Sequence, residues 1–222
     1  HRSLVAILQA DLSFGWVRNT PIEQIDALLT APEAVAQELG GNLLDRLLEQ
    51  NTDLANRFST DRIIDFAHHE IQAVRQLAHT LFERLIERFQ AGTDPHHQSE
   101  LGAAIRLLDI QWDEDRQRWF NIFQQPFTAE DFTPDILVSF CDSTREDVQA
   151  FGRELVKIYF TEAAGVDYLL KFSEHPSVAM QQFATDFLVE YAADNPARLE
   201  ALKPYFFSVL SRVNKARTAK NK

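Results

Sequence analysis

The sequence predicts an all-α protein, an α-α superhelix in which antiparallel helix pairs stack on one another. Three stretches align without a gap, and the last two begin 32 residues apart. In the second half of each, apolar residues recur at the i, i+3, i+4, i+7 spacing of an amphipathic helix. No alternating run of β-branched residues bounded by turn residues competes with this interpretation. The stretches are Ile64–Phe82, Val138–Val156 and Leu170–Leu188.

The aligned positions carry similar side chains. A large apolar residue is followed at once by a small one. The small residue is expected to let a neighbouring helix approach closely, and the large one to fill the space between the two helices. The matching sets are Phe66, Phe140 and Phe172; Val74, Val148 and Met180; Leu77, Phe151 and Phe183; Ala78, Gly152 and Ala184; and Leu81, Leu155 and Phe187.

Each unit is expected to hold a first helix that ends just after the shared phenylalanine, a short polar turn and a second helix. In the second unit, Ser143 and Glu146 have the spacing of a capping box. In the third, Pro176 stands where a helix starts.

The N-terminal residues 1–58 are expected to form helices less regularly. Thr20–Glu23 resembles a capping box with Pro21 at the first helical position, and Gly40-Gly41 is expected to break the next segment. The expected elements here are a helix over Ser3–Val17 and a pair over Asn42–Glu49 and Thr52–Phe58.

We expect one domain over residues 1–222. Ser99–Gln125 is interpreted as a divergent copy, because a shift of 32 residues places Leu108 under Phe140 and Trp119 under Phe151. Gln90–Gln98 is the best loop candidate. The expected repeat units span about 59–90, 99–127, 131–160 and 162–192. Asn195-Pro196 is expected to mark a break before the last helix, over Leu199–Val213, within a capping segment at 196–216.

The string Ile71–Ala78 resembles the second-helix signature of HEAT and armadillo-type repeats, in which an aliphatic residue, often followed by Arg, precedes an Ala. Gln149 and Gln181 replace that Arg in the other two copies. The resemblance implies a scaffold or adaptor that binds another protein or a peptide, more than an enzyme. The partner-binding candidates are polar positions of the second helices: Gln72, Arg75, Gln76, His79, Gln149, Arg153, Gln181 and Gln182.

Charge disfavours a nucleic-acid partner. The net charge is −11, and the last 20 residues carry +6, which leaves −17 on the rest of the chain. Nucleic-acid binding depends on clustered basic residues. The alternative is a HEAT-like nucleic-acid-binding or DNA-repair glycosylase-type protein, which requires a basic groove holding an aromatic residue and a carboxylate.

Chemistry-bearing residues form no recognised signature. Asp65, His68, His79 and Glu83 would hold a metal only if two helices brought them together, and the Glu-x-x-His pattern of such sites is absent. Cys141 is the only cysteine and is expected to be a small buried residue. We expect no cofactor and no metal.

The sequence also predicts where the protein is located and whether the chain is part of a larger one. No apolar run is long enough to span a bilayer, so we expect no membrane partner and a cytoplasmic location. The chain starts at His1 and its only methionine is Met180, which suggests a part of a larger protein.

Overall fold

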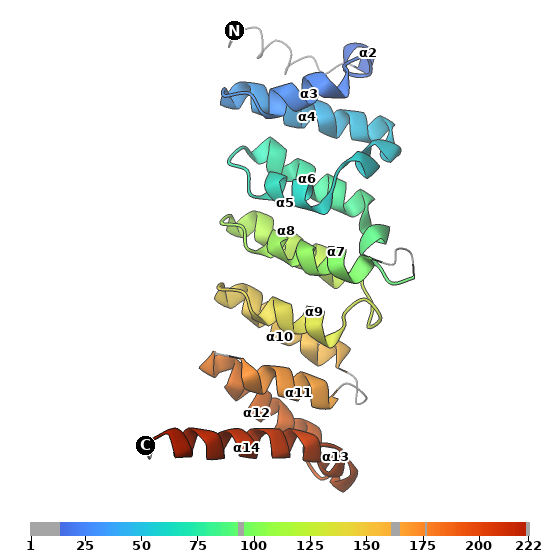
Figure 1. Ribbon diagram of the computed structural model, residues 1–222. Helices are drawn as coiled ribbons and strands as arrows, with labels where there is room; N and C mark the ends of the chain where they lie inside the picture. Colours follow the sequence, from blue (N-terminus) through green and yellow to red (C-terminus); the bar gives the residue numbers. More distant parts are fainter. Residues whose placement is uncertain (1–13, 93–95, 161–164, 176, 221–222) are drawn as a thin grey trace. The chain divides into compact units, whose positions relative to one another are not determined.

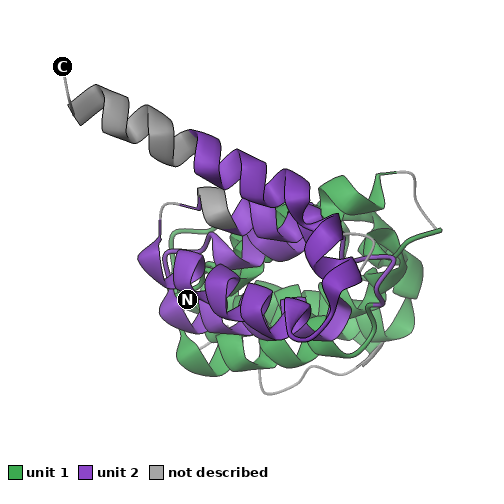
Figure 2. Cartoon of the chain, turned by 90° about the horizontal axis from the view of Figure 1, so that it is seen from below, with its two compact units in different colours: residues 1–127 green, residues 128–222 purple. Residues whose placement is uncertain are grey.

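The computed structural model describes residues 14–92, 96–160, 165–175 and 177–220 (Figure 1). All regular structure in these residues is helical, which confirms the all-α prediction. The chain divides into two compact units, residues 1–127 and 128–222 (Figure 2).

Unit 1 consists of helix pairs that pack on one another. Within a pair, α3 packs on α4 and α5 packs on α6. In the third pair the 3-10 turn η3, which follows α7, packs on α8. Between pairs, α4 packs on α6, α5 on α7, and α6 on α8 (Figure 1). The helices are α2 (Phe14–Val17), α3 (Ile22–Leu29), α4 (Ala34–Gln50), α5 (Thr60–Ala67), α6 (Gln72–Arg84), α7 (His97–Ala104) and α8 (Asp113–Gln124), with 3-10 turns η1 (Thr52–Arg57), η2 (Ile86–Phe89) and η3 (Ile105–Leu108).

Unit 2 repeats the same local arrangement. The α9 helix packs on α10 and α11 on α12, while α11 also contacts α9 and α14. The helices are α9 (Pro134–Cys141), α10 (Glu146–Tyr159), α11 (Gly165–Glu174), α12 (Val178–Ala192), α13 (Pro196–Ala201) and α14 (Lys203–Lys220).

The helix–turn–helix prediction is confirmed in all three aligned stretches. The first helices α5, α9 and α11 end one or two residues after Phe66, Phe140 and Phe172, and these three rings are buried. The small residues Ala78, Gly152 and Ala184 are buried as well. In the two later pairs the aligned rings also contact each other across the pair, with centroids 5.8 Å apart for Phe140 and Phe151 and 5.5 Å apart for Phe172 and Phe183.

Gly152 shows why one of these positions must be small. A Cβ added to it would lie 2.8 Å from Phe140 Cβ, 2.9 Å from Cys141 Sγ and 3.0 Å from the backbone nitrogen of Cys141. Because one of these atoms is backbone, α10 has no room for a side chain where it crosses the end of α9.

Substituting Gly152 by alanine is therefore expected to destabilise unit 2 by about 2 kcal/mol, since overpacking outweighs the better helix propensity of alanine. Cys141 is the only cysteine and is fully buried in this unit, so the rate at which its thiol reacts across a urea series reports unfolding there. Gly15→Ala is the control, because a Cβ on Gly15 would meet no atom within 4 Å. A urea midpoint for Gly152→Ala equal to that of the control would contradict the close crossing.

The expected break at Gly40-Gly41 is wrong. The α4 helix runs through both residues, and its partner is α3, so residues 22–50 form a regular pair. A Cβ on Gly40 would lie 3.0 Å from the nitrogen of Leu29, and one on Gly41 would lie 3.0 Å from the carbonyl carbon of Ala73. The two glycines allow α4 to pack closely on α3 and on α6, and this packing offsets their low helix propensity.

The two expected capping boxes are also wrong. Pro21 lies at the N-cap of α3 and not at the first helical position, and the hydroxyl of Thr20, the expected capping group, donates to the carbonyl of Trp16 at 3.0 Å. Ser143 Oγ accepts from the backbone N–H of Arg145 at 3.1 Å, so it closes the turn before α10 instead of pairing with Glu146.

The C-terminal helices differ from the prediction, and most of the expected N-terminal helix lies outside the described residues. The expected final helix is divided at Leu202 into α13 and α14, and the Asn195 side chain caps α13 by accepting from the N–H of Arg198. Of the helix expected over Ser3–Val17, only Phe14–Val17 falls within the described residues and is helical. Pro176 also lies outside them.

Candidate functional site

A recurring hydrogen bond closes the turn of every helix pair and accounts for several candidate residues. In each case a side chain in the second helix donates to a backbone carbonyl six residues earlier. The bonds join Gln37 to Ala31 (2.8 Å), Arg75 to His69 (3.1 Å), Arg116 to Ile110 (2.8 Å), Gln149 to Ser143 (2.7 Å) and Gln181 to His175 (2.9 Å). Arg75, Gln149 and Gln181 therefore use at least one donor to hold the fold.

The three aligned turns share a second bond. The residue whose backbone carbonyl accepts the first bond also accepts a second one. Its side chain accepts from the backbone N–H of the residue two positions later. The acceptors are His69 Nδ1 (3.0 Å), Ser143 Oγ (3.1 Å) and His175 Nδ1 (3.0 Å), and the donors are Ile71, Arg145 and Ser177. Histidine and serine are interchangeable here because both present an acceptor at short reach.

Arg75 is a buried structural residue. Its side chain is 10% exposed and lies with its guanidinium carbon 3.9 Å from the centroid of the Trp112 ring. Nε donates to Asp115 Oδ2 at 2.5 Å, and Nη1 also donates to the carbonyl of Glu70 at 2.9 Å. Arg75 thus connects the α5–α6 pair to α8, and its burial leaves this partner-binding candidate little surface to offer a partner.

His79, another partner-binding candidate, is buried too, at 1% exposure, and has almost no surface to offer a partner. Its ring centroid lies 4.1 Å from that of Trp119. Neither ring nitrogen of His79, nor Nε1 of Trp119, has a hydrogen-bond partner among the described residues. Burial, with a smaller contribution from the charge of Arg118, lowers the pKa of His79 to about 3, so the ring is neutral near pH 7.

Gln72 and Gln76 are exposed, and both line a groove of about 390 Å³ between α4 and α6. They are four residues apart and so share one face of α6. Glu38 and Asn42, also four apart, present the facing side of α4. Glu70, Ile71 and Ala73 complete the lining.

The groove is acidic and rich in amides. Among its described lining residues are two carboxylates and three carboxamides, and no lysine or arginine. The Glu70 carboxylate accepts one long hydrogen bond, 3.3 Å, from Gln111. A carboxamide offers both a donor and an acceptor, so the groove suits an extended polar chain that carries a positive charge.

Sequence reasoning missed Glu38 and Asn42. A break was expected at Gly40-Gly41, between these two residues, so they were not assigned to one face of a single helix. The i, i+4 spacing of the two residues was the available signal, and it has meaning only once α4 is continuous.

The two remaining candidates lie in unit 2. Gln182 is exposed and donates to Asp186 Oδ1 at 2.9 Å, one turn further along α12. Arg153 is half-buried, with Nη1 3.7 Å from Met180 Sδ. Neither lines the α4–α6 groove.

The residues considered for chemistry do not converge. His68 Nε2 lies 3.1 Å from the carbonyl of Arg106, Glu83 accepts from Arg118, and His79 is inside the core. Within the described part of the chain, no group of three or more His, Cys, Asp and Glu side chains is placed to hold a metal ion. Cys141 is buried as expected, and burial raises its thiol pKa to about 12, so the thiol is protonated near neutral pH.

None of the helices in the described ranges is long and apolar enough to cross a membrane. Comparisons with protein-family models, curated proteins and solved structures find no match to this chain.

Proposed function

We propose that this chain is a HEAT-like helical-repeat interaction module that binds a basic segment of a partner protein in the α4–α6 groove. The observation that carries the proposal is the lining of this groove. Glu38 and Glu70 supply two carboxylates, and neither is engaged in an ion pair with another described residue. A lysine or arginine side chain of a partner would find both charge and hydrogen-bond acceptors there.

The remaining lining suits the rest of a peptide. Ile71 and Ala73 offer apolar surface to the methylene stem of a basic side chain, because such stems pack on apolar atoms while the charged end stays polar. Asn42, Gln72 and Gln76 offer donors and acceptors to a peptide backbone. The −17 charge outside the last 20 residues would also attract a basic partner over long range.

The repeat interpretation rests on the recurring turn. Five helix pairs close with the same bond between a second-helix side chain and a carbonyl six residues earlier. Repeated units of this kind are commonly used to build an extended binding surface. This supports a scaffold or adaptor role for the chain.

The test is selection of random displayed peptides on the full chain, followed by fluorescence anisotropy of the enriched peptides. Enriched peptides are expected to carry Lys or Arg. Glu38→Gln with Glu70→Gln is expected to weaken binding by about tenfold, since two charge-assisted contacts of roughly 0.5–1 kcal/mol each are lost. The matched control is Glu114→Gln with Glu130→Gln, which removes the same charge from exposed positions outside the groove.

Three outcomes would overturn the proposal. Enriched peptides without basic residues would remove its chemical basis. Equal weakening by both double variants would show that only the overall charge attracts the peptide. Tight, salt-sensitive binding of a labelled DNA duplex at about 50 mM salt would favour a nucleic-acid function instead.

A further inference from the structure

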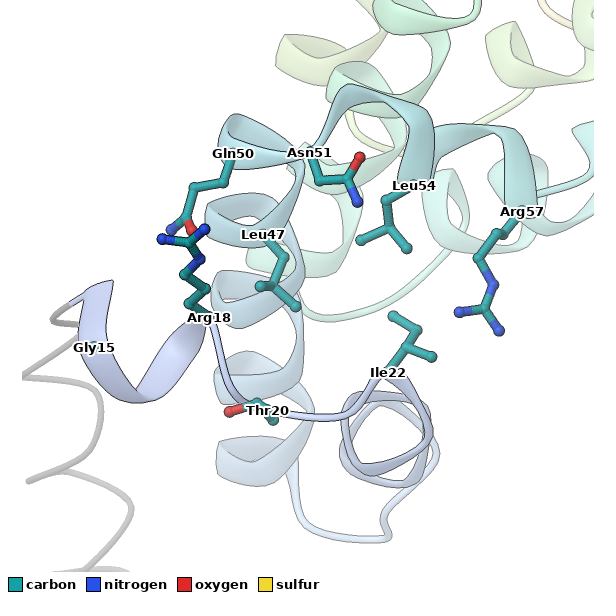
Figure 3. Close-up of a pocket in the computed structure, with 9 residues that line it drawn as sticks. All are labelled: Gly15, Arg18, Thr20, Ile22, Leu47, Gln50, Asn51, Leu54 and Arg57. Atoms are coloured by element: carbon teal, nitrogen blue, oxygen red, sulfur yellow. The ribbon is translucent and has the colours of Figure 1, made fainter.

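The α4–α6 groove differs from the larger hollow of unit 1 in how its surroundings respond to pH. The larger hollow, of about 1000 Å³, lies between α2, α3, the end of α4 and η1 (Figure 3). Its charged lining residues, Arg18 and Arg57, lie at opposite ends, with apolar side chains between them (Figure 3). Arginine is not deprotonated in proteins, so pH does not change the charge of this lining. The α4–α6 groove is different, because a histidine holds one of its walls.

His69 is bonded to the turn that forms this wall. Its side chain is half-buried, and Nδ1 accepts a hydrogen bond from the backbone N–H of Ile71 at 3.0 Å. Glu70 and Ile71 both line the groove. Arg75 holds the same turn through its bonds to the carbonyls of His69 and Glu70. The position of Ile71 and of the neighbouring Glu70 therefore depends on the ring of His69.

The direction of this bond fixes the protonation state of the ring. A backbone N–H can only donate, so Nδ1 must present a lone pair, and the neutral ring carries its proton on Nε2. A protonated imidazole has hydrogen on both nitrogens and cannot accept. Protonation of His69 would therefore break the bond to Ile71. Ser143 Oγ makes the corresponding bond in unit 2 at 3.1 Å, and a hydroxyl does not titrate near neutral pH.

The surroundings of His69 favour the neutral ring. Burial is the largest cause and lowers the pKa of His69 below its usual 6.5; Glu70 raises this pKa, while Arg75 and Arg62 lower it. Arg62 lies on α5 and Arg75 on α6, where Arg75 pairs with Asp115 of α8. The ring is therefore neutral near pH 7.5 and takes up a proton as the solution becomes mildly acidic.

A proton on His69 and a basic ligand in the groove oppose each other. A cation bound by Glu38 and Glu70 would lie next to His69 in the chain and would disfavour a second positive charge there. By reciprocity, a protonated His69 weakens the binding of that cation. The loss of the bond to Ile71 acts in the same direction, since it releases the wall on which Glu70 is placed.

We propose that His69 makes the α4–α6 groove sensitive to pH: its neutral ring holds the wall formed by Glu70 and Ile71, and protonation of the ring releases a bound basic segment. His69 is thus a positioning residue of the groove. This regulation rests on the function proposed above and acts at the same site.

Fluorescence anisotropy on the full chain at pH 7.5 and pH 5.0 tests the proposal. The probe is the most enriched Lys- or Arg-containing peptide of the selection described above, synthesised with glutamine in place of any histidine. The wild-type chain is expected to bind it about fivefold more weakly at pH 5.0, since uptake of one competing proton weakens binding by at most about tenfold per pH unit. Far-UV circular dichroism at both pH values confirms that the chain remains helical.

Two substitutions separate the hydrogen bond from the charge. His69→Ser is expected to match the wild type at pH 7.5 and to stay within about twofold of that affinity at pH 5.0, because a hydroxyl keeps the bond to Ile71 and takes up no proton. His69→Ala offers no acceptor, so it is expected to bind about threefold more weakly than the wild type already at pH 7.5.

His68→Ser is the matched control. His68 is exposed, does not line the groove, and has Nε2 3.1 Å from the carbonyl of Arg106. This variant is expected to keep the wild-type loss of about fivefold at pH 5.0. Protonation of other groups affects all the variants alike, so the difference between them reports on His69.

The outcomes distinguish this regulation from the function on which it rests. Binding that is equal at the two pH values would overturn the regulation and leave the groove as a peptide site. A loss at pH 5.0 that His69→Ser retains or His68→Ser removes would do the same, as would equal binding by His69→Ser and His69→Ala at pH 7.5. No binding of the basic peptide at pH 7.5 would overturn both proposals.

Discussion

Replacing Arg75 by alanine is expected to lower the free energy of unfolding of unit 1 by about 3 kcal/mol, because it leaves the partly buried carboxylate of Asp115 without its partner. The same change removes the donor to the carbonyls of His69 and Glu70 and the cation that lies over Trp112. All three tryptophans lie within residues 1–127, so urea unfolding followed by tryptophan fluorescence reports on this unit.

Two further variants identify which contact matters. Arg75→Gln places in this turn the residue that the two later units use, so it is expected to keep the carbonyl bond and to lose only the contacts with Asp115 and Trp112. Asp115→Asn in the Arg75→Gln background is expected to recover part of the loss, since it removes the unpaired charge.

Arg118→Ala is the control, because its 3.4 Å contact with Glu83 is about half exposed and should contribute less than about 1 kcal/mol. A loss for Arg75→Ala no larger than that of this control would rule out a structural role for the ion pair.

The sequence was sufficient for the paired helices of the three aligned stretches. Their phenylalanines, aliphatic residues and small residues recur because the same close contact between two helices must be made in each unit. That constraint acts on side-chain size and apolarity, which periodicity detects directly. The ends of the first helices and the burial of most aligned side chains were predicted for this reason, while Phe183 and Phe187 are only partly buried.

The N-terminal pair was missed for a physical reason. Two adjacent glycines usually weaken a helix, and from sequence alone Gly40 and Gly41 indicate a break. In the structure they lie where α4 meets Leu29 of α3 and Ala73 of α6. Only the tertiary contact shows that the absence of a side chain stabilises the helix there. Because a continuous α4 was not predicted, Glu38 and Asn42 could not be placed on one helical face.

The candidate binding residues show a second limit. A polar residue on a second helix indicates solvent or a ligand, but Arg75, Gln149 and Gln181 donate back to their own turn. The distance of six residues spans a helix end, so helical periodicity does not detect it. Once the bond is recognised, Gln37 and Arg116 identify the α3–α4 and α7–α8 pairs as members of the same series.

Acidification is expected to destabilise unit 1 through His79. The pKa of His79 is lowered from 6.5 in the unfolded chain to about 3 in the folded one, mainly by burial. The unfolded state therefore binds a proton that the folded state does not, so the stability is fully present above about pH 6.5 and is lost as the pH falls toward 3. Between pH 7 and pH 4 this residue should account for a loss of about 3 kcal/mol.

His79→Leu is expected to remove most of that pH dependence and to stabilise the protein at pH 4, because an apolar side chain of similar size leaves no unpartnered nitrogen beside Trp119. Urea midpoints from tryptophan fluorescence at pH 7 and pH 4 measure the effect. His96→Leu, at an exposed position before α7, is the control and should retain the wild-type difference between the two pH values. If His79→Leu kept the full wild-type difference, the protons taken up on unfolding would have to bind elsewhere, and the burial of His79 beside Trp119 would have no bearing on the acid stability of the unit.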